Sequence, residues 1–515
     1  MPVLERLSAA RPFMRLFARS SGGRGARNAA ALFGGTLFLG YYSLWGKNPL
    51  LSESIKSIKH FGTSTPESQE QNTISLLSDA EVTRRLRQLE ESHFVQRGSG
   101  LVRFDVAQLP SNSPIEDAHI EQVVTVPGRD EARDEDLYFF GVFDGHSGPY
   151  TSAKLAQDLV PYVAHQLSKV YTAGVVSASV AENVVDNALS DAFKLLDRDI
   201  VLGSLGNLFQ NPSKETLTRA LPAVSGSCAL LAMFDSQSST LKCAVTGDSR
   251  ALLASVNKEG QWSVKALTVD QTGDNESEVA RIQAEHPGEQ NAVRNGRVLG
   301  SLQPSRAFGD YRYKVKDIDG KSVRDLPDHL KIYFRREPNA FHTPPYVTAE
   351  PVISTAQVNS DVKFMVLASD GLYELLSNDE IASLVVKWMQ HNPVVPGAAP
   401  LRTSGPAGKL TPVRDTSEDA ESQRPAFRYR SQTKNPSEYL LEDKNVATHL
   451  IRNALSAKGN KDYVSTLVSI PSPMSRKYRD DLTVTVVFFD HNENHEQTGR
   501  LVINDEATTK PRAKL

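Results

Sequence analysis

Four apolar, β-branched segments of this chain meet acidic residues at one end, and this pattern constrains the fold more than any other feature of the sequence. The pairs are Glu116-Asp117 before 120–126, Asp144-Gly145 after 138–143, Asp370-Gly371 after 364–368 and Asp480-Asp481 before 482–489. Each predicts a carboxylate at the rim of a buried sheet, where an isolated charge is costly. One such acid is usually a turn former or a helix cap. Four together predict convergence on a hard divalent cation, because oxygen-rich sites favour magnesium or manganese.

Strands and helices are mixed between about residues 100 and 490. Apolar runs predict strands at 120–126, 137–143, 226–234, 241–246, 250–256, 363–368 and 482–489. Helical periodicity covers 151–170 and 275–285, the second after the capping residues Asp274 and Asn275. The runs 241–246 and 250–256 predict an antiparallel pair around the turn 247–249. Paired strands with helices elsewhere indicate an α+β fold and not a doubly wound parallel sheet. Asp248 lies in that turn and is ambiguous, since Gly-Asp-Ser is also ordinary hairpin chemistry.

The acidic balance of the chain also points to bound cations. Composition is that of a globular protein, with 39% hydrophobic and 23% charged residues and a net charge of −3. Residues 1–48 hold seven basic residues and one acidic residue, which leaves 51 basic and 60 acidic residues in the remainder, a net charge of −9. Such a body does not attract nucleic acid, and it repels phosphate-bearing substrates unless it carries cations.

The N-terminal segments predict targeting. Residues 1–28 have arginines at roughly helical spacing, with serine, alanine and almost no acid, as in a mitochondrial presequence. The apolar run 29–45 is at the lower limit for spanning a bilayer and is interpreted as a transmembrane or sorting segment. A buried helix or a secretory signal core is the alternative. Within 46–95, the Ser/Thr/Gln/Glu-rich stretch 52–75 predicts a linker, and 76–95 predicts a helix.

Three other features bear on organisation. Residues 393–437 are rich in Pro, Gly, Ser and charge and predict a disordered insertion within the domain 96–490. The polar tail 491–515 is expected to be loose. Cys228 and Cys243, the only cysteines, lie in apolar β-like runs, which predicts buried free thiols and not a disulfide framework or a zinc site.

An ordered set of motifs resembles the metal-dependent PP2C family of Ser/Thr protein phosphatases over roughly residues 100–490. The motifs are PIEDAH (114–119), FGVFDGHSG (140–148), SGSCALLA (225–232), TGDSRALLA (246–254), SRAFGD (305–310), LASDGLYELLS (367–377) and RDDLTVTVV (479–487). A single DGH motif would be weak, but seven in the order of the family are specific. The resemblance implies an α-β-β-α sandwich, two antiparallel sheets flanked by helices, with two Mg²⁺ or Mn²⁺ ions at one end.

The resemblance also implies ligands for those ions. Asp144 would bridge both ions, and the Gly145 carbonyl would bind one of them. Glu116 would serve one ion, while Asp370 and Asp480 would serve the other.

Four neighbouring acids receive lesser roles from the same resemblance. Asp117 would orient water without binding metal. Asp248 and Glu374 fall where the family can hold a weaker third ion, although the family often has Asp at the second place. Asp481 falls where many members have Asn, so it is expected to be a neighbour and not a primary ligand.

The implied reaction is direct, in-line attack of water on the phosphoryl group, which needs no cysteine or serine nucleophile. His146 is the candidate that protonates the leaving Ser/Thr oxygen, because imidazole titrates in the suitable range. The alternative for His146 is a histidine packed in a turn.

One position departs from the family pattern. Most members have an arginine four residues before the metal-binding Glu, where it can hold substrate phosphate, and this chain has Asn112. An amide offers a neutral hydrogen bond in place of a charged fork, so phosphate binding must rely more on metals or on another cation. Arg306 and Arg250 are candidates for that cation, and Arg250 is equally well explained as structural.

The segment around Asn112 resembles the pyruvate dehydrogenase phosphatase branch of the family. Further matches to that branch are HPGEQ (286–290), RVLGSLQPSRAFGD (297–310), TPPYVTAEP (343–351), VATHLIRNAL (446–455) and YRDDLTV (478–484). The branch implies phosphoserine on the E1α subunit of the pyruvate dehydrogenase complex as the substrate. It agrees with a mitochondrial location, either in the matrix or anchored in the inner membrane through 29–45 and facing the intermembrane space.

Two alternatives remain open. One is a phosphatase that acts on other mitochondrial proteins, and the other is a catalytically silent binding protein of the same fold. A kinase or nucleotide-binding protein is disfavoured, because the sequence has no Gly-rich phosphate loop with a following Lys.

Overall fold

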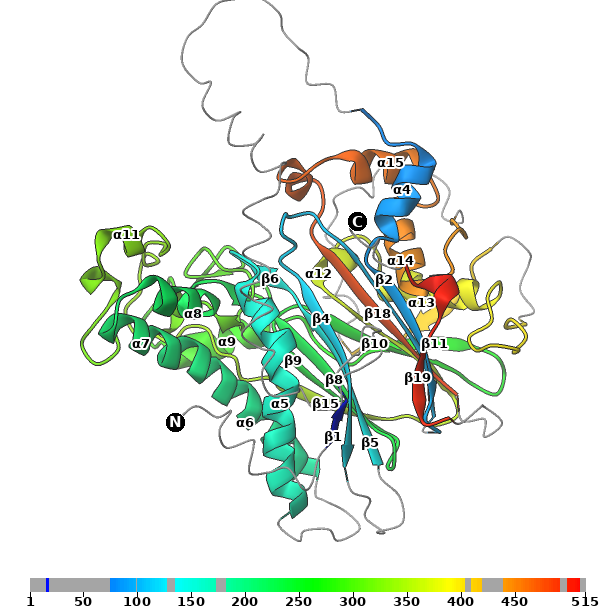
Figure 1. Ribbon diagram of the computed structural model, residues 1–515, viewed down its shortest axis with the longest axis horizontal. Coiled ribbons are helices and arrows are strands. Elements are labelled where there is room, and N and C mark those ends of the chain that lie inside the picture. The colour runs from blue at the N-terminus through cyan, green and yellow to red at the C-terminus, as the bar shows by residue number, and fades with distance from the viewer. Residues whose placement is uncertain are drawn as a thin grey trace, which may run out of the picture. The chain divides into compact units, whose positions relative to one another are not determined.

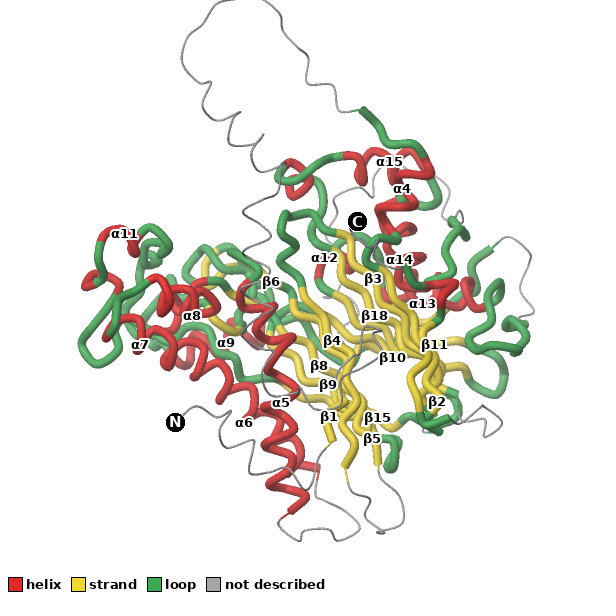
Figure 2. Tube along the Cα trace, viewed as in Figure 1, coloured by secondary structure: helices red, strands yellow, loops and turns green. Residues whose placement is uncertain are grey.

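The computed structural model describes residues 75–98, 100–126, 135–172, 182–402, 409–418, 439–490 and 498–509, together with the backbone of 15–17. Two β-sheets form the centre of this part of the chain, with helices on both sides (Figures 1 and 2).

The first sheet has six strands, and every neighbouring pair is antiparallel. In spatial order they are β1 (Arg15–Phe17), β4 (Ala118–Val126), β5 (Glu135–Phe143), β8 (Ala229–Asp235), β9 (Thr240–Thr246) and β15 (Val352–Gln357).

The second sheet has eight strands and is antiparallel except where β17 joins β11 in parallel. In spatial order they are β17 (Val413–Asp415), β11 (Trp262–Ala266), β10 (Arg250–Val256), β16 (Val362–Ala368), β18 (Leu482–Phe489), β3 (Leu101–Leu109), β2 (Glu90–Gln96) and β19 (Arg500–Ile503).

Side chains that alternate along the strands divide the interior into layers. Phe139 of β5 packs with the helices that cover the first sheet, whereas Phe140 faces the second sheet, where its ring lies 5.4 Å from that of Phe104. On the far side of the second sheet, the Trp388 and Phe488 rings stack at 5.8 Å. Helix, sheet, sheet and helix therefore follow one another, which confirms the predicted α-β-β-α sandwich.

The helices on the first sheet are α5 (Tyr150–Thr172), α6 (Glu182–Arg198), α7 (Ser204–Gln210) and α8 (Lys214–Val224), with the π-helical turn Asp199–Gly203 between α6 and α7. Those on the second sheet are α4 (Asp79–Leu86), α13 (Asn378–Met389), α14 (Val446–Leu455) and α15 (Lys461–Ser469). Shorter elements are β6 (Gly145–His146), β7 (Gly226–Ser227), α9 (Glu276–Glu285), β12 (Val293–Arg294), β13 (Arg297–Val298), β14 (Phe308–Gly309), α10 (Tyr311–Lys314), α11 (Asp328–Lys331), α12 (Asp370–Tyr373) and the 3₁₀ turns Val323–Asp325, Met474–Lys477 and Asp505–Ala507.

All seven predicted strands are present, as are the helices predicted at 151–170 and 275–285. The Asn275 side chain caps α9 by accepting a hydrogen bond from the Ser277 N–H. Both cysteines are buried free thiols, as predicted. The predicted hairpin of 241–246 with 250–256 is wrong, because β9 pairs with β8 and β15 whereas β10 pairs with β11 and β16. Residues 247–249 therefore pass from one sheet to the other.

Three predictions of local structure are wrong in part. The helix predicted over 76–95 ends at Leu86, and residues from Glu90 form β2, because EESHFVQ pairs with β3. In the tail, Arg500–Ile503 adds to the edge of β2. Within 393–437, residues 409–418 include β17, and Val394, Val395, Leu401 and Leu410 pack against the core of the second sheet. The high content of Pro, Gly and Ser predicted disorder because these few apolar residues contribute little to the average composition of the segment.

Most of the N-terminal predictions lie outside the described residues. These are the presequence 1–28, apart from the backbone of Arg15–Phe17 in β1, the apolar run 29–45 and nearly all of the linker 52–75. Among the helices of the described ranges, none has the length and apolarity needed to cross a bilayer.

Candidate metal centre

The strand register brings the predicted acids to one end of both sheets. Ala118 lies opposite Phe143, so the start of β4 and the end of β5 are neighbours. Ala368 lies opposite both Val484 and Arg250, so the end of β16 meets the starts of β18 and β10. The acids that flank these strand ends are consequently neighbours in space.

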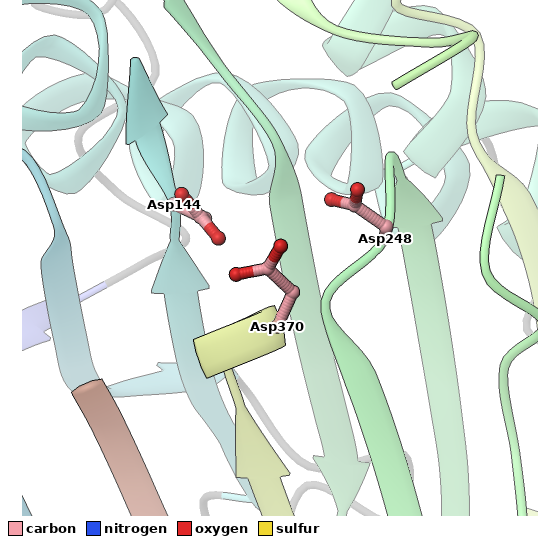
Figure 3. Close-up of side chains that lie close together, drawn as sticks. All are labelled: Asp144, Asp248 and Asp370. Atoms are coloured by element: carbon pink, nitrogen blue, oxygen red, sulfur yellow. The ribbon is translucent and has the colours of Figure 1, made fainter. Parts of the chain in front are cut away.

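Three aspartates form the centre of this group. Asp144, Asp248 and Asp370 each offer a carboxylate oxygen, and these oxygens all lie within 4.8 Å of one another. Figure 3 shows the three side chains pointing toward one another from the β5–β6 junction, the β9–β10 crossover and the start of α12. Asp248 is therefore at the crossover between the sheets and not in a hairpin turn, and its carboxylate lies beside those of Asp144 and Asp370.

The crossover that carries Asp248 is tightly packed. Gly247 has φ +110°, and a Cβ there would overlap the side chain of Cys228. The Cys228 thiol donates to Asp248 Oδ1 at 3.1 Å. Glycine is therefore required for the sheet-to-sheet crossing, and the buried cysteine orients one carboxylate.

The charges of these acids are uncompensated in the protein alone. Burial, followed by the charges of Asp117, Asp370, Asp480 and Asp248, raises the pKa of Asp144 well above its ordinary value. The pKa of Asp370 is raised by burial and by Asp480, Asp248 and Glu374. Burial likewise raises the pKa of Asp248 to about 6. Close, buried carboxylates of this kind must bind protons or cations.

A second carboxylate holds the loop that carries Glu116. Asp481 is 2% exposed. Its Oδ1 accepts from the N–H groups of Ser111 (2.5 Å) and Asn112 (3.1 Å), and its Oδ2 accepts from the Glu116 N–H (2.9 Å). Asp481 thus holds the loop 111–116 through three backbone N–H groups.

Glu116 is itself oriented by hydrogen bonds. Its Oε1 accepts from the Gly148 N–H at 2.6 Å, and its Oε2 accepts from Asn112 Nδ2 at 3.0 Å. The Ser152 hydroxyl donates to the Glu116 carbonyl, and a Cβ at Gly145 would overlap that carbonyl. Glycine at 145 therefore lets the loop that bears Glu116 approach Asp144 closely.

Asp117 is buried and directly follows Glu116 in the chain. Its Oδ2 accepts from the Thr483 hydroxyl at 2.6 Å, and burial together with Asp481 raises its pKa to about 8. Asp117 also interacts with the centre. After burial, its charge is the largest contribution to the raised pKa of Asp144.

Asp480 lies at the edge of the centre. Its side chain is 15% exposed and forms an ion pair with Arg476. Its charge raises the pKa values of Asp144 and Asp370, after the larger effect of burial, so it belongs to the same group. Glu374 directly follows α12, four residues after Asp370, and its charge also contributes to the raised pKa of Asp370.

His146 is held by an acid that the motif analysis left without a role. Its Nε2 lies 2.6 Å from Asp310 Oδ2. Burial alone would lower the pKa of His146, but Asp310, Asp248 and Glu116 outweigh it and raise the pKa. The local signal for Asp310, an acid beside Gly309, is weak because the preceding strand β14 has only two residues.

The two arginines predicted as substitutes for an arginine at 112 are engaged elsewhere. Arg306 forms a fork with Glu278, with Nη2 to Oε1 at 2.7 Å, and donates to the Glu350 carbonyl at 2.9 Å. Arg250 is 2% exposed and pairs with Asp270 and Asn378. Both guanidinium groups pair with acids outside the predicted ligand set, whereas Arg476, which the sequence did not single out, pairs with Asp480.

The donor set fits Mg²⁺ or Mn²⁺. All candidate side-chain ligands are carboxylates, which these hard cations prefer, and three of them converge within 4.8 Å. Burial, followed by the charges of the neighbouring acids, raises the pKa values of Asp144 and Asp370, and a bound cation would offset both effects.

Comparisons with known proteins agree with this geometry. Residues 111–403 match the family described as protein phosphatase 2C. The chain is 53% identical to a mitochondrial pyruvate dehydrogenase (acetyl-transferring)-phosphatase 1 of Saccharomyces cerevisiae, over 94% of this chain and 89% of that protein. It is 38% identical to a protein phosphatase 2C homolog of Schizosaccharomyces pombe, over 79% of this chain and 85% of that protein. It is 31% identical to the Homo sapiens protein with the same name as the budding-yeast one, over 76% of this chain and 78% of that protein.

Proposed function

This chain belongs to the protein phosphatase 2C family, and we propose that it dephosphorylates phosphoserine on the E1α subunit of the mitochondrial pyruvate dehydrogenase complex. The chain is accordingly a protein Ser/Thr phosphatase. The observation that carries the activity is the convergence of Asp144, Asp248 and Asp370 within 4.8 Å. The identity of 53% over 94% of the chain with a protein named for that substrate supports the substrate.

Five residues are proposed to hold two Mg²⁺ or Mn²⁺ ions: Asp144 between them, with the Gly145 carbonyl, Glu116, Asp370 and Asp480 around them. Bound there, the ions would lower the pKa of a water molecule and offset the charge of the phosphoryl group. We assign Asp248 and Glu374 to a weaker third ion. Asp117, enclosed next to Asp144, would orient water by accepting its hydrogen bond.

The chain itself supplies the proton for the leaving group. Asp310 engages Nε2 of His146 at 2.6 Å and favours the imidazolium form. The proton passed to the leaving serine oxygen would therefore be the one on Nδ1. Asp310 fixes the ring orientation in the same interaction.

We place the enzyme in the mitochondrial matrix, where it would meet the dehydrogenase complex directly. The basic, acid-poor composition of residues 1–28 supports this, as does the word "mitochondrial" in the names of the relatives.

The test measures phosphate release from a phosphoserine peptide of E1α with Mg²⁺ or Mn²⁺. Asp144→Asn removes one central carboxylate, while Asp328→Asn removes an acid whose side chain is 98% exposed and serves as the matched control. We expect activity in the wild type and the control and none in Asp144→Asn. Activity in Asp144→Asn equal to the wild type would refute the metal centre.

A second substrate separates the substrate claim from the activity. A generic aryl phosphate reports on the centre alone. If the enzyme hydrolyses it but leaves the E1α peptide intact, the phosphatase acts on other proteins and the proposed substrate is wrong.

A further inference from the structure

A single turn brings an arginine to the edge of the acidic centre. Arg476 lies in the 3₁₀ turn Met474–Lys477, four residues before Asp480, with which it forms an ion pair. Its side chain is 43% exposed, so the guanidinium is at the surface of the site. Because Asp480 is a proposed metal ligand, a guanidinium paired with it lies at the edge of the centre to which a substrate phosphate would bind.

This turn is fastened to the segment that carries Asn112. The Ser475 hydroxyl donates to the Ser111 carbonyl at 2.5 Å, and Arg479 Nη2 donates to the Pro110 carbonyl at 2.7 Å. Ser475 and Arg479 are 1% and 5% exposed. Because buried hydrogen bonds on both sides of Arg476 lead to residues 110 and 111, the turn is held next to position 112. Most members of the protein phosphatase 2C family have an arginine at this position, where it can hold substrate phosphate.

Position 112 cannot supply the cation itself. The Asn112 N–H donates to Asp481, and Nδ2 donates to Glu116. An arginine at this position would meet the buried Asp481 carboxylate and pair with it. Arg306 and Arg250 are bound to Glu278 and Asp270. Arg476, in contrast, forms an ion pair with Asp480, one of the proposed metal ligands.

We propose that Arg476 binds the phosphoryl group of the substrate in place of the arginine that most relatives carry at position 112. The proposal rests on the proposed phosphatase function. In the protein alone, Arg476 neutralises Asp480. Once Asp480 binds a cation, the guanidinium fork is available to phosphoryl oxygens, for which arginine is well suited.

The experiment compares Arg476→Ala, Arg476→Lys and Lys477→Ala. Lys477 is exposed in the same turn, so its removal changes the net charge equally without touching Asp480. Calorimetry measures binding of inorganic phosphate to the Mn²⁺-loaded protein, and kinetics give kcat and KM for the E1α phosphopeptide. We expect Arg476→Ala to weaken phosphate binding and raise KM about ten- to a hundredfold. Arg476→Lys should recover part of the loss, and Lys477→Ala should match the wild type.

A purely structural role, in which Arg476 only positions Asp480, gives a different result. In that case Arg476→Ala raises the Mn²⁺ concentration needed for half-maximal activity, and excess Mn²⁺ restores the wild-type KM. That outcome overturns the proposal, as does phosphate affinity within about twofold of the wild type, far below the loss expected for a charged hydrogen bond. Failure of the proposed function looks different again: the wild type releases no phosphate, although binding of phosphate by the three variants can still be compared.

Discussion

Asp481→Asn tests how the protein positions a metal ligand through a residue that does not bind metal. The buried Asp481 carboxylate accepts from three backbone N–H groups of the loop that carries Glu116. Asparagine keeps the volume and one oxygen, which can still serve Ser111 and Asn112. Its amide nitrogen would then face the Glu116 N–H, two donors in contact. The substitution therefore removes one hydrogen bond to a charged acceptor, which contributes about 1.5–3 kcal/mol.

Because about 1.4 kcal/mol corresponds to a factor of ten, loosening Glu116 by this amount should raise the half-saturating Mn²⁺ concentration about ten- to a hundredfold. The assay is a Mn²⁺ titration of aryl phosphate hydrolysis, with Asp328→Asn as the surface control. At saturating Mn²⁺ we expect kcat of Asp481→Asn to return close to the wild-type value. Asp480→Asn, which removes a proposed ligand, should not recover. A wild-type Mn²⁺ requirement in Asp481→Asn would refute the view that these hydrogen bonds hold Glu116 in place.

Three further predictions concern the metal, a buried acid and the proton donor. Mn²⁺ at about a hundred times its Kd should raise the free energy of unfolding by about 2.7 kcal/mol for each ion bound. Scanning calorimetry with and without chelator measures this, and an unchanged Tm would disprove it. Burial raises the pKa of Glu90 from its ordinary 4.5 to about 7, so its carboxyl destabilises the folded state increasingly as pH rises from 4.5 to 7. Glu90→Gln should therefore stabilise the protein by about 3 kcal/mol at pH 8 and hardly at all at pH 4.5. Denaturant titrations at several pH values measure this. The same difference in unfolding free energy between variant and wild type at every pH would contradict burial as the cause. Asp310→Asn should lower kcat for the phosphoserine peptide about ten- to a hundredfold. It should change kcat for an aryl phosphate little, because the aryl leaving group needs no proton. Equal losses on both substrates would argue against a proton-donor role for His146.

The strand-end acids illustrate what the sequence could predict. Three of these acids, Asp144, Asp370 and Asp480, each adjoin a long apolar strand. When such strands pair, the ends of neighbouring strands lie side by side, regardless of how the connecting loops run. The prediction needed the pattern of strands and acids but no knowledge of the connections. The wrong assignment of β9 and β10 to one hairpin therefore does not change which strand ends are expected to lie together. That error arose because a short Gly-Asp-Ser connection has the same local chemistry in a tight turn and in a crossing between sheets.

Arg476 and Asp310 show what the sequence could not predict. Arg476 stands in a polar segment with Lys477 and Arg479, where a charged side chain is ordinarily a solvated one. Its place is fixed by Ser475, which contacts Ser111, a residue 364 positions earlier in the chain. Asp310 follows a strand of two residues, too short to give an apolar period. Both depend on contacts between segments remote in sequence, about which local patterns are silent.

The two departures from the family pattern, Asn112 and Asp481, are in direct contact in this chain. An arginine at 112 beside Asp481 would form a buried ion pair and be lost to the substrate, whereas asparagine at 112 donates to Asp481 and to Glu116 at once. Conversely, the Asp481 carboxylate gives the loop stronger acceptors than an amide would. The exchange strengthens the support of Glu116 and removes a positive charge from the phosphate side of the centre. Such a loss is tolerable only if another cation is near, and the turn that carries Arg476 is hydrogen-bonded to the same loop. The three positions are therefore expected to depend on one another in double-mutant cycles.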